Sequence, residues 1–171
     1  TADLRHAESV AVTLHYRLAF PEVLVTMVAS GASGAEVEAD LAVLDVEARR
    51  RLGHALYGTG DDDLAVVVGR ALSERGQTLA TAESCTGGMI GQTITAVAGS
   101  STYYLGGVIA YANEVKHGVL GVSEATLLDH GAVSEACVRE LSEGVRRLTG
   151  ATYGIAVSEL LDPAADRLKS R

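Results

Sequence analysis

The chain has 171 residues, of which 47% are hydrophobic and 21% are charged, so it can build an ordinary domain core and is not a disordered chain. Its 14 basic and 22 acidic side chains give a formal net charge of −8, which repels phosphate backbones and argues against general nucleic-acid binding. Its two cysteines are too few for a disulfide framework or a four-thiolate zinc site.

The first fifty residues predict two strands followed by one helix. Apolar residues alternate with smaller or polar ones over residues 10–16, and the alternation resumes over residues 23–29 after Pro21 and Glu22 interrupt it. Ser33, with Glu36 three residues later, is typical of a capping box at a helix start. The helix then shows one apolar face, formed by Val37, Leu41, Leu44, Ala48 and Leu52. We expect a small α+β module over residues 1–54.

A hinge-like stretch, residues 57–63, contains two glycines and ends in three consecutive aspartates. Aspartates commonly cap a helix start and complement its dipole, so they predict a helix from Leu64 that ends at Gly76. A metal site is the alternative, and the apolar helix that follows at once disfavours it.

The remaining chain alternates between strands and helices, which predicts a layered α/β domain with a mainly parallel sheet and helices on both faces. Ser123 and Ser134 are predicted helix N-caps, and Gly150 is expected to close the helix that begins after Ser134. A polar, helical tail is expected after Ser158, so that the sheet stops early. The expected strands are 78–82, 106–112 and 153–157, and a further helix is expected over 89–97.

The turn between the strand at 78–82 and the helix at 89–97 is the first candidate site. Ligands in open α/β sheets bind beyond the carboxyl ends of strands, and Gly87 and Gly88 let the backbone approach a ligand closely. Ser84 is then a candidate nucleophile, and the N–H groups of the turn would face a developing oxyanion. Two alternatives stay open: Ser84 and Thr86 only cap the following helix, or Cys85 is the nucleophile.

A second polar cluster follows the strand at 106–112 and would lie on the same rim of the sheet as Ser84. Lys116 loses its proton readily when desolvated and can then serve as a base toward a serine hydroxyl, with Tyr111 orienting or relaying the proton. Asn113 belongs to the same cluster. The alternative is an ordinary solvated lysine at a helix start. His117 and His130 lack metal-ligand spacing, so we expect no metal site.

Four blocks of this sequence resemble the C-terminal domain of the CinA family. The blocks are TLATAESCTGG, AGSSTYYLGGVIAYANEVKHGVLGV, HGAVSEACVRELSEGVRR and GATYGIAVS, and they lie between about Asp62 and Ser158. The segment YRLAFPEV at residues 16–23 is similar to the KH-like connecting module of longer CinA proteins. The molybdopterin-binding-like domain of those longer proteins is expected to be absent from this chain.

The resemblance implies a nicotinamide mononucleotide deamidase, an amidohydrolase of pyridine nucleotide salvage that releases ammonia and nicotinic acid mononucleotide. The family's catalytic serine, tyrosine and lysine fall on Ser84, Tyr111 and Lys116. The residues expected to bind the substrate are Glu83, Cys85, Thr86, Gly87, Gly88 and Asn113. No metal or organic cofactor is expected, and the deamidase domain is expected over residues 55–171.

The sequence departs from the family after Ser158, where the family continues with a glycine-rich run and this chain continues with ELLDPAADRLKSR. Either the domain is incomplete there, or a stretch is omitted between Ser158 and Glu159. The departure keeps a rival function open, an inactive nucleotide-binding or scaffold member of the family. A partner module for DNA uptake or repair is the second rival, and the acidic balance argues against direct nucleic-acid contact.

For partners, we expect a small nucleotide substrate, no nucleic acid and no membrane. The first residues lack the apolar stretch of a signal peptide, and no apolar run approaches the roughly 20 residues of a membrane span, so a cytoplasmic protein is expected. A short apolar sheet needs cover, which favours a homo-oligomer, with a dimer as the first expectation.

Overall fold

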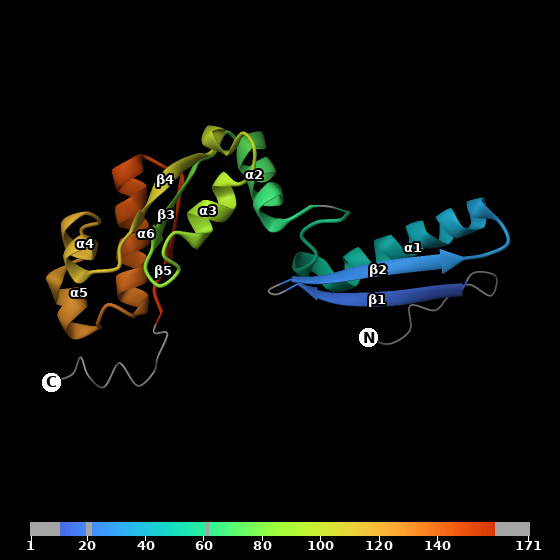
Figure 1. The fold of residues 1–171 in the computed structure, drawn as a ribbon, viewed down its shortest axis with the longest axis horizontal. Coiled ribbons are helices and arrows are strands. Elements are labelled where there is room, and N and C mark those ends of the chain that lie inside the picture. The colour runs from blue at the N-terminus through green and yellow to red at the C-terminus, as the bar shows by residue number, and fades with distance from the viewer. Residues whose placement is uncertain (1–10, 20–21, 61, 160–171) are drawn as a thin grey trace. The chain divides into compact units, whose positions relative to one another are not determined.

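A computed structural model of the chain describes residues 11–19, 22–60 and 62–159 (Figure 1). The described residues divide into two compact units, one ending at Tyr57 and the other beginning at Gly58. This division falls within the hinge-like stretch of residues 57–63. The tail for which we predicted a helix lies outside the described residues, as does Val10 of the first predicted strand.

The first unit is an antiparallel hairpin with one helix. Strands β1 (Ala11–Ala19) and β2 (Glu22–Ser30) pair so that Tyr16 lies opposite Val25, and helix α1 (Gly34–Leu52) runs along the hairpin in Figure 1. Opposite residues of an antiparallel pair share a face, which collects the apolar side chains on one side of the hairpin. A short 3₁₀ turn, η1 (Gly53–Ala55), follows α1. The two predicted strands and the predicted helix are all present.

The predicted capping box at the start of α1 is wrong. Ser33 is the N-cap residue, with extended backbone, but its side chain accepts no hydrogen bond from the helix. The first turn is closed instead by the main chain, since the N–H of Val37 donates to the Ser33 carbonyl over 3.1 Å.

The second unit is built on a parallel sheet of three strands in the order β4-β3-β5, which confirms the predicted α/β class. Helix α6 (Glu135–Thr149) contacts all three strands on one face, and α3 (Met89–Thr95), which packs on α2 (Leu64–Glu74), covers β3 and β4 on the other (Figure 1). The remaining elements are β3 (Leu79–Glu83), η2 (Ser100–Thr102), β4 (Tyr104–Ile109), α4 (Asn113–Gly118), α5 (Glu124–Asp129) and β5 (Tyr153–Val157).

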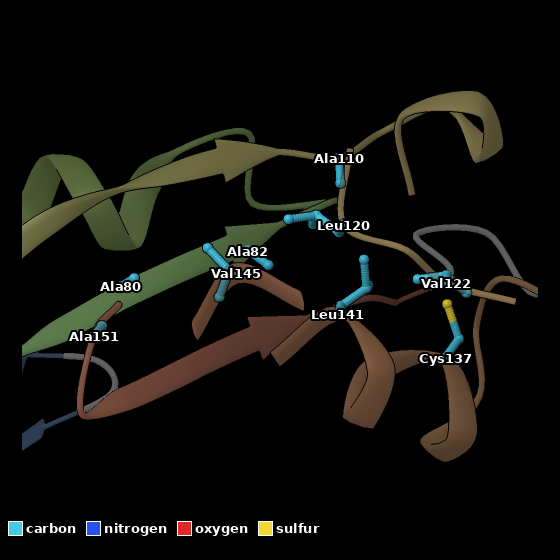
Figure 2. Packing of buried hydrophobic residues seen from close by; sticks show 9 residues of the cluster. All are labelled: Ala80, Ala82, Ala110, Leu120, Val122, Cys137, Leu141, Val145 and Ala151. Carbon is cyan, nitrogen blue, oxygen red and sulfur yellow. The ribbon is translucent and has the colours of Figure 1, made fainter. Parts of the chain in front are cut away.

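The side chains of β3 alternate between two apolar clusters. Ala80 and Ala82 are fully buried on the α6 face, where Figure 2 shows them with Leu141 and Val145. Leu79 points to the opposite face and joins a smaller cluster whose other members are Leu72, Ile94 and Tyr103. This alternation places the carboxylate of the last residue of β3, Glu83, on the α3 face of the sheet.

Three predicted helix caps are confirmed by side-chain hydrogen bonds. Asp63 accepts from the N–H of Val66 over 2.8 Å, and Ser123 and Ser134 accept from the helix N–H three residues on. Gly150 ends α6 with a φ of 73°, a left-handed conformation that glycine adopts without strain.

The second predicted strand of this unit is shifted along the chain. We expected 106–112, whereas β4 spans Tyr104–Ile109. The strand register with β3 ends at Glu83 and Ile109, and the carbonyls of the next two residues, Ala110 and Tyr111, accept hydrogen bonds from Lys116.

Within the described ranges, the structure contains no helix with both the length and the apolar character needed to cross a membrane. The same part of the chain contains no group of three or more His, Cys, Asp and Glu side chains arranged to hold a metal ion.

Candidate functional site

Ser84 lies at the carboxyl end of the central strand, where both neighbouring strands hold its backbone. Its N–H donates to the Val157 carbonyl at the end of β5 over 3.0 Å. On the other side, the Glu83 carbonyl accepts from the N–H of Ala110, just after β4, over 2.7 Å. The Ser84 side chain therefore begins from a fixed backbone, at the edge of the sheet where open α/β proteins bind ligands.

Lys116 reaches the Ser84 hydroxyl from helix α4. Its ammonium or amine nitrogen, Nζ, lies 3.2 Å from Ser84 Oγ, and the two residues are 1% and 8% exposed. Nζ also donates to the carbonyl oxygen of Tyr111 over 3.1 Å and to that of Ala110. The alternative of a solvated lysine at a helix start is wrong, because this lysine is among the most buried large side chains of the described chain.

The neighbours of Lys116 Nζ suit a proton acceptor for Ser84. Two backbone carbonyls can only accept, so they take two N–H bonds of the amine in either protonation state. A neutral amine that donates to both carbonyls can direct its lone pair toward the Ser84 hydroxyl, 3.2 Å away. The arrangement can therefore activate a serine nucleophile without a histidine.

Glu83 is a buried carboxylate, 2% exposed, that binds the loop after Ser84. It accepts from the Thr86 hydroxyl over 2.7 Å and from the N–H groups of Ile90 and Gly91 over 2.9 and 2.8 Å. Burial alone would raise the pKa of the Glu83 carboxyl, but these bonds, with one from the Gly88 N–H, hold that pKa below its ordinary value.

Two consecutive glycines turn the loop into helix α3. Gly87 and Gly88 have φ of 61° and 103°, in the region that favours glycine. Gly88 is the N-cap residue of α3, and the side chain that accepts from N–H groups of its first turn is that of Glu83, so the alternative in which Ser84 and Thr86 cap it is wrong.

The loop offers fewer backbone donors than the sequence indicated. The Gly87 N–H donates to the Ser84 carbonyl over 3.2 Å, and the Gly88 N–H lies toward the Glu83 carboxylate and helps to lower the pKa of that carboxyl. For the N–H groups of Cys85 and Thr86, no hydrogen bond is seen among the described residues. These two are the amides that can face a ligand.

The other predicted site residues lie nearby with exposed or half-exposed side chains. Tyr111 meets Lys116 through its carbonyl oxygen, while its side chain is 74% exposed. Asn113, the first residue of α4, is exposed, and Cys85 is a half-buried free thiol. The structure thus brings together the side chains of Ser84 and Lys116 and the main chain of Tyr111.

The contribution of two backbone carbonyls to the site was missed by the sequence reasoning. Ala110 and Tyr111 hold the Lys116 amine through atoms that every residue possesses, so their side chains carry no signal of this role. The only hint was a strand that ends in a polar cluster.

A groove of about 660 Å³ lies between α6 and the end of β5. Ser158 lines it and donates its hydroxyl to the Ala132 carbonyl over 3.0 Å. Neither Ser84 nor Lys116 is among its lining residues, so the groove is separate from the serine–lysine pair.

Comparison with known proteins identifies related sequences over most of the chain. The family profile described as the CinA C-terminal domain matches residues 61–169. A CinA-like protein of Synechococcus sp. (strain CC9902) is 46% identical over 151 residues, which are 88% of this chain and 36% of that protein. A CinA-like protein of Salinibacter ruber is 49% identical over 125 residues, 73% of this chain and 30% of that protein. The chain spans about a third of the length of the curated relatives it matches.

Solved structures are similar in fold. The competence damage-inducible protein A (ComA) of Klebsiella pneumoniae is 47% identical with a TM-score of 0.57, over 58% of this chain and 62% of that one. The competence/damage inducible protein CihA of Agrobacterium tumefaciens is 33% identical with a TM-score of 0.58, over 63% of this chain and 66% of that one.

Proposed function

This chain belongs to the CinA family through its C-terminal domain, and on that premise we propose that it is a nicotinamide mononucleotide deamidase. In this proposal it hydrolyses the carboxamide of the nucleotide to nicotinic acid mononucleotide and ammonia. The observation that carries the proposal is the buried pair of Ser84 Oγ and Lys116 Nζ, 3.2 Å apart at the carboxyl end of the sheet. Such a pair suits acyl transfer from an amide.

The first half of the reaction forms an acyl-enzyme. Neutral Lys116 accepts the Ser84 proton while Oγ attacks the carboxamide carbon, and the carbonyl oxygen becomes an oxyanion. The tetrahedral intermediate then collapses, and the ammonium of Lys116 returns that proton to the leaving nitrogen. Ammonia departs, and the nicotinoyl group of the nucleotide is left as an ester of Ser84.

The second half uses the same base. Lys116 accepts a proton from a water molecule as that water attacks the ester, and then returns the proton to Ser84 Oγ. The product acid leaves and the resting serine is restored. In both halves the amine keeps its place because the carbonyls of Ala110 and Tyr111 bind it.

Oxyanion stabilisation falls to the loop that follows the nucleophile. The N–H groups of Cys85 and Thr86 are the proposed donors, a narrower set than all the N–H groups of the turn, which the sequence analysis considered. Removing one such donor from an acyl-transfer site typically costs on the order of 100-fold to 1,000-fold in rate.

Tyr111 and Asn113 are the side chains proposed to contact the incoming nucleotide. The Tyr111 side chain is 74% exposed, so a bound substrate can contact its phenol. Proton relay by that phenol remains a prediction, as does substrate binding by Asn113.

The test is direct. Purified protein is incubated with nicotinamide mononucleotide, and ammonia and nicotinic acid mononucleotide are measured over time. Equal release of both products supports the proposal. Free nicotinamide is the matched substrate control, and absence of ammonia from the nucleotide at any enzyme concentration overturns it.

A second candidate function, a nucleotide-binding or scaffold protein without turnover, is favoured by one observation. After β5 the chain continues with Ser158 and Glu159, where the family resemblance implies a glycine-rich run that helps to line the pocket. Calorimetric binding of the nucleotide without ammonia release would support this candidate over the deamidase.

A further inference from the structure

The Glu83 carboxylate spans the whole loop that follows the proposed nucleophile. One oxygen, Oε2, accepts from the Thr86 hydroxyl and from the Ile90 N–H over 2.7 and 2.9 Å. The other oxygen, Oε1, accepts from the Gly91 N–H over 2.8 Å. The carboxylate therefore joins the end of β3 to the first turn of α3, with Ser84 at the start of the segment between them.

The same bonds leave Glu83 poorly suited to bind a substrate. Both oxygens already have donors within the chain, and the side chain is only 2% exposed. A buried carboxylate is tolerated where hydrogen bonds replace its lost water, and this one has such bonds from three residues and from the Gly88 N–H. The carboxylate oxygens of Glu83 therefore accept their hydrogen bonds from the protein itself and not from a substrate.

We infer that Glu83 is a positioning residue, which fixes the Cys85 and Thr86 amides and the Ser84 hydroxyl relative to the substrate carbonyl. This inference rests on the proposed deamidase reaction, and it replaces the substrate-binding role that the sequence suggested for Glu83. The residue acts through the loop and does not contact the reacting atoms.

The start of helix α3 can approach the Glu83 carboxylate closely. A Cβ on Gly91 would lie 2.7 Å from the Tyr104 hydroxyl and 3.4 Å from Glu83 Oε1, so glycine lets the helix start rest directly on the carboxylate. The Tyr104 hydroxyl is itself held by Thr81, 2.7 Å away on β3. Glu83 and Thr81, which hold the start of α3 and the Tyr104 hydroxyl, therefore both belong to β3, the strand that leads into Ser84.

The principal test is Glu83→Gln, which keeps the size of the side chain but turns an NH₂ group toward backbone donors. Misplacement of a catalytic group by about 1 Å can cost on the order of 100-fold in rate, so we expect kcat for ammonia release to fall about 10- to 100-fold. KM for nicotinamide mononucleotide should change by less than about threefold, since the lost interaction acts in the transition state. A rise in KM with unchanged kcat would show a substrate ligand and overturn the inference.

Hydrogen–deuterium exchange gives a readout that does not depend on turnover. In Glu83→Gln, the amides of residues 87–91 should exchange faster than in the wild type, while those of β5 keep their protection. If the wild type releases no ammonia, the deamidase proposal fails, and exchange alone then decides whether Glu83 holds the loop. Unchanged exchange over residues 87–91 overturns the positioning role in either case.

Two further variants keep the test decisive. Thr86→Val removes one of the bonds to Glu83 without changing the charge, and it should lower kcat in the same direction by a smaller factor. The matched control is Glu140→Gln, because Glu140 also accepts a backbone N–H and hydroxyls at a helix start, from Thr126 of α5 and from Ser123, the N-cap residue of that helix. If Glu83→Gln does not fold, Thr86→Val with unchanged kcat and unchanged loop exchange refutes the inference.

Discussion

Replacing Lys116 with methionine separates a catalytic lysine from a structural one. The side chain keeps its length in a site that is 1% exposed, but the amine is lost. Two carbonyls, those of Ala110 and Tyr111, then lose a donor. At about 1–3 kcal/mol for each unsatisfied buried group, the expected loss of unfolding free energy is at most about 2–6 kcal/mol.

That loss is partly offset, because the variant no longer buries a polar amine. The effect of Lys116→Met on catalysis has a different cause, which is the loss of the proposed base. A general base contributes on the order of 100- to 10,000-fold, so kcat for ammonia release should fall by that factor even where Lys116→Met is fully folded. The assay is ammonia release from nicotinamide mononucleotide, with urea unfolding followed by circular dichroism on the same preparation.

Arg70→Met provides the matched control. It also exchanges a cation for methionine, but at a side chain that is 57% exposed and pairs with Asp62 over 2.9 Å. Loss of such a surface pair costs about 0.2–1 kcal/mol and should leave the activity unchanged. If folded Lys116→Met keeps activity within about tenfold of the wild type, a barrier change of only about 1.4 kcal/mol, Lys116 is not the base.

Three further predictions concern backbone fit and pH. Gly144→Ala places a Cβ against the Leu120 carbonyl, so it should lower the unfolding free energy by about 1–3 kcal/mol, although Ala is normally favoured within a helix. Gly118→Ala, which meets nothing within 4 Å, is its control, and an equal urea midpoint for both variants would contradict this. Gly88→Ala forces a side chain onto a φ of 103° and should cost about 1–3 kcal/mol together with activity; undiminished turnover would refute the loop's role. Because the pKa of Glu83 is lowered in the folded protein, its carboxylate stabilises the fold above pH 4.5, and this contribution is lost as the pH falls through the lowered pKa. Acid should therefore lower the unfolding free energy of the wild type more steeply than that of Glu83→Gln. Parallel curves of unfolding free energy against pH for the two proteins would contradict this prediction.

Much of the fold follows from patterns that act locally. The alternation of Val12, Leu14 and Tyr16 predicts a strand because side chains of a strand alternate between two faces. Ser123 and Ser134 predict helix starts because a short hydroxyl can satisfy an unpaired helix N–H, and both do so. Ser33 has the same pattern, yet its hydroxyl accepts no hydrogen bond from the helix. This difference could not be predicted, because the sequence does not determine how the hydroxyl is oriented.

The site was predictable only as far as topology determines it. Parallel strands bring their carboxyl ends to one edge, which is why Ser84 and Lys116, 32 residues apart, meet. The exposure of the Tyr111 phenol was not predictable, because it depends on how the chain leaves β4. Nor was the role of Glu83, whose partners are backbone N–H groups that only the folded loop presents.

Ammonia release by the Ser84→Ala variant tests the serine–lysine account most directly. Removal of one oxygen atom takes away the group that lies 3.2 Å from Lys116 Nζ and leaves the backbone bond to Val157 in place. Folded Ser84→Ala should release no ammonia from nicotinamide mononucleotide above the uncatalysed rate, under conditions where the wild type does. Turnover of that variant at the wild-type rate would contradict the account.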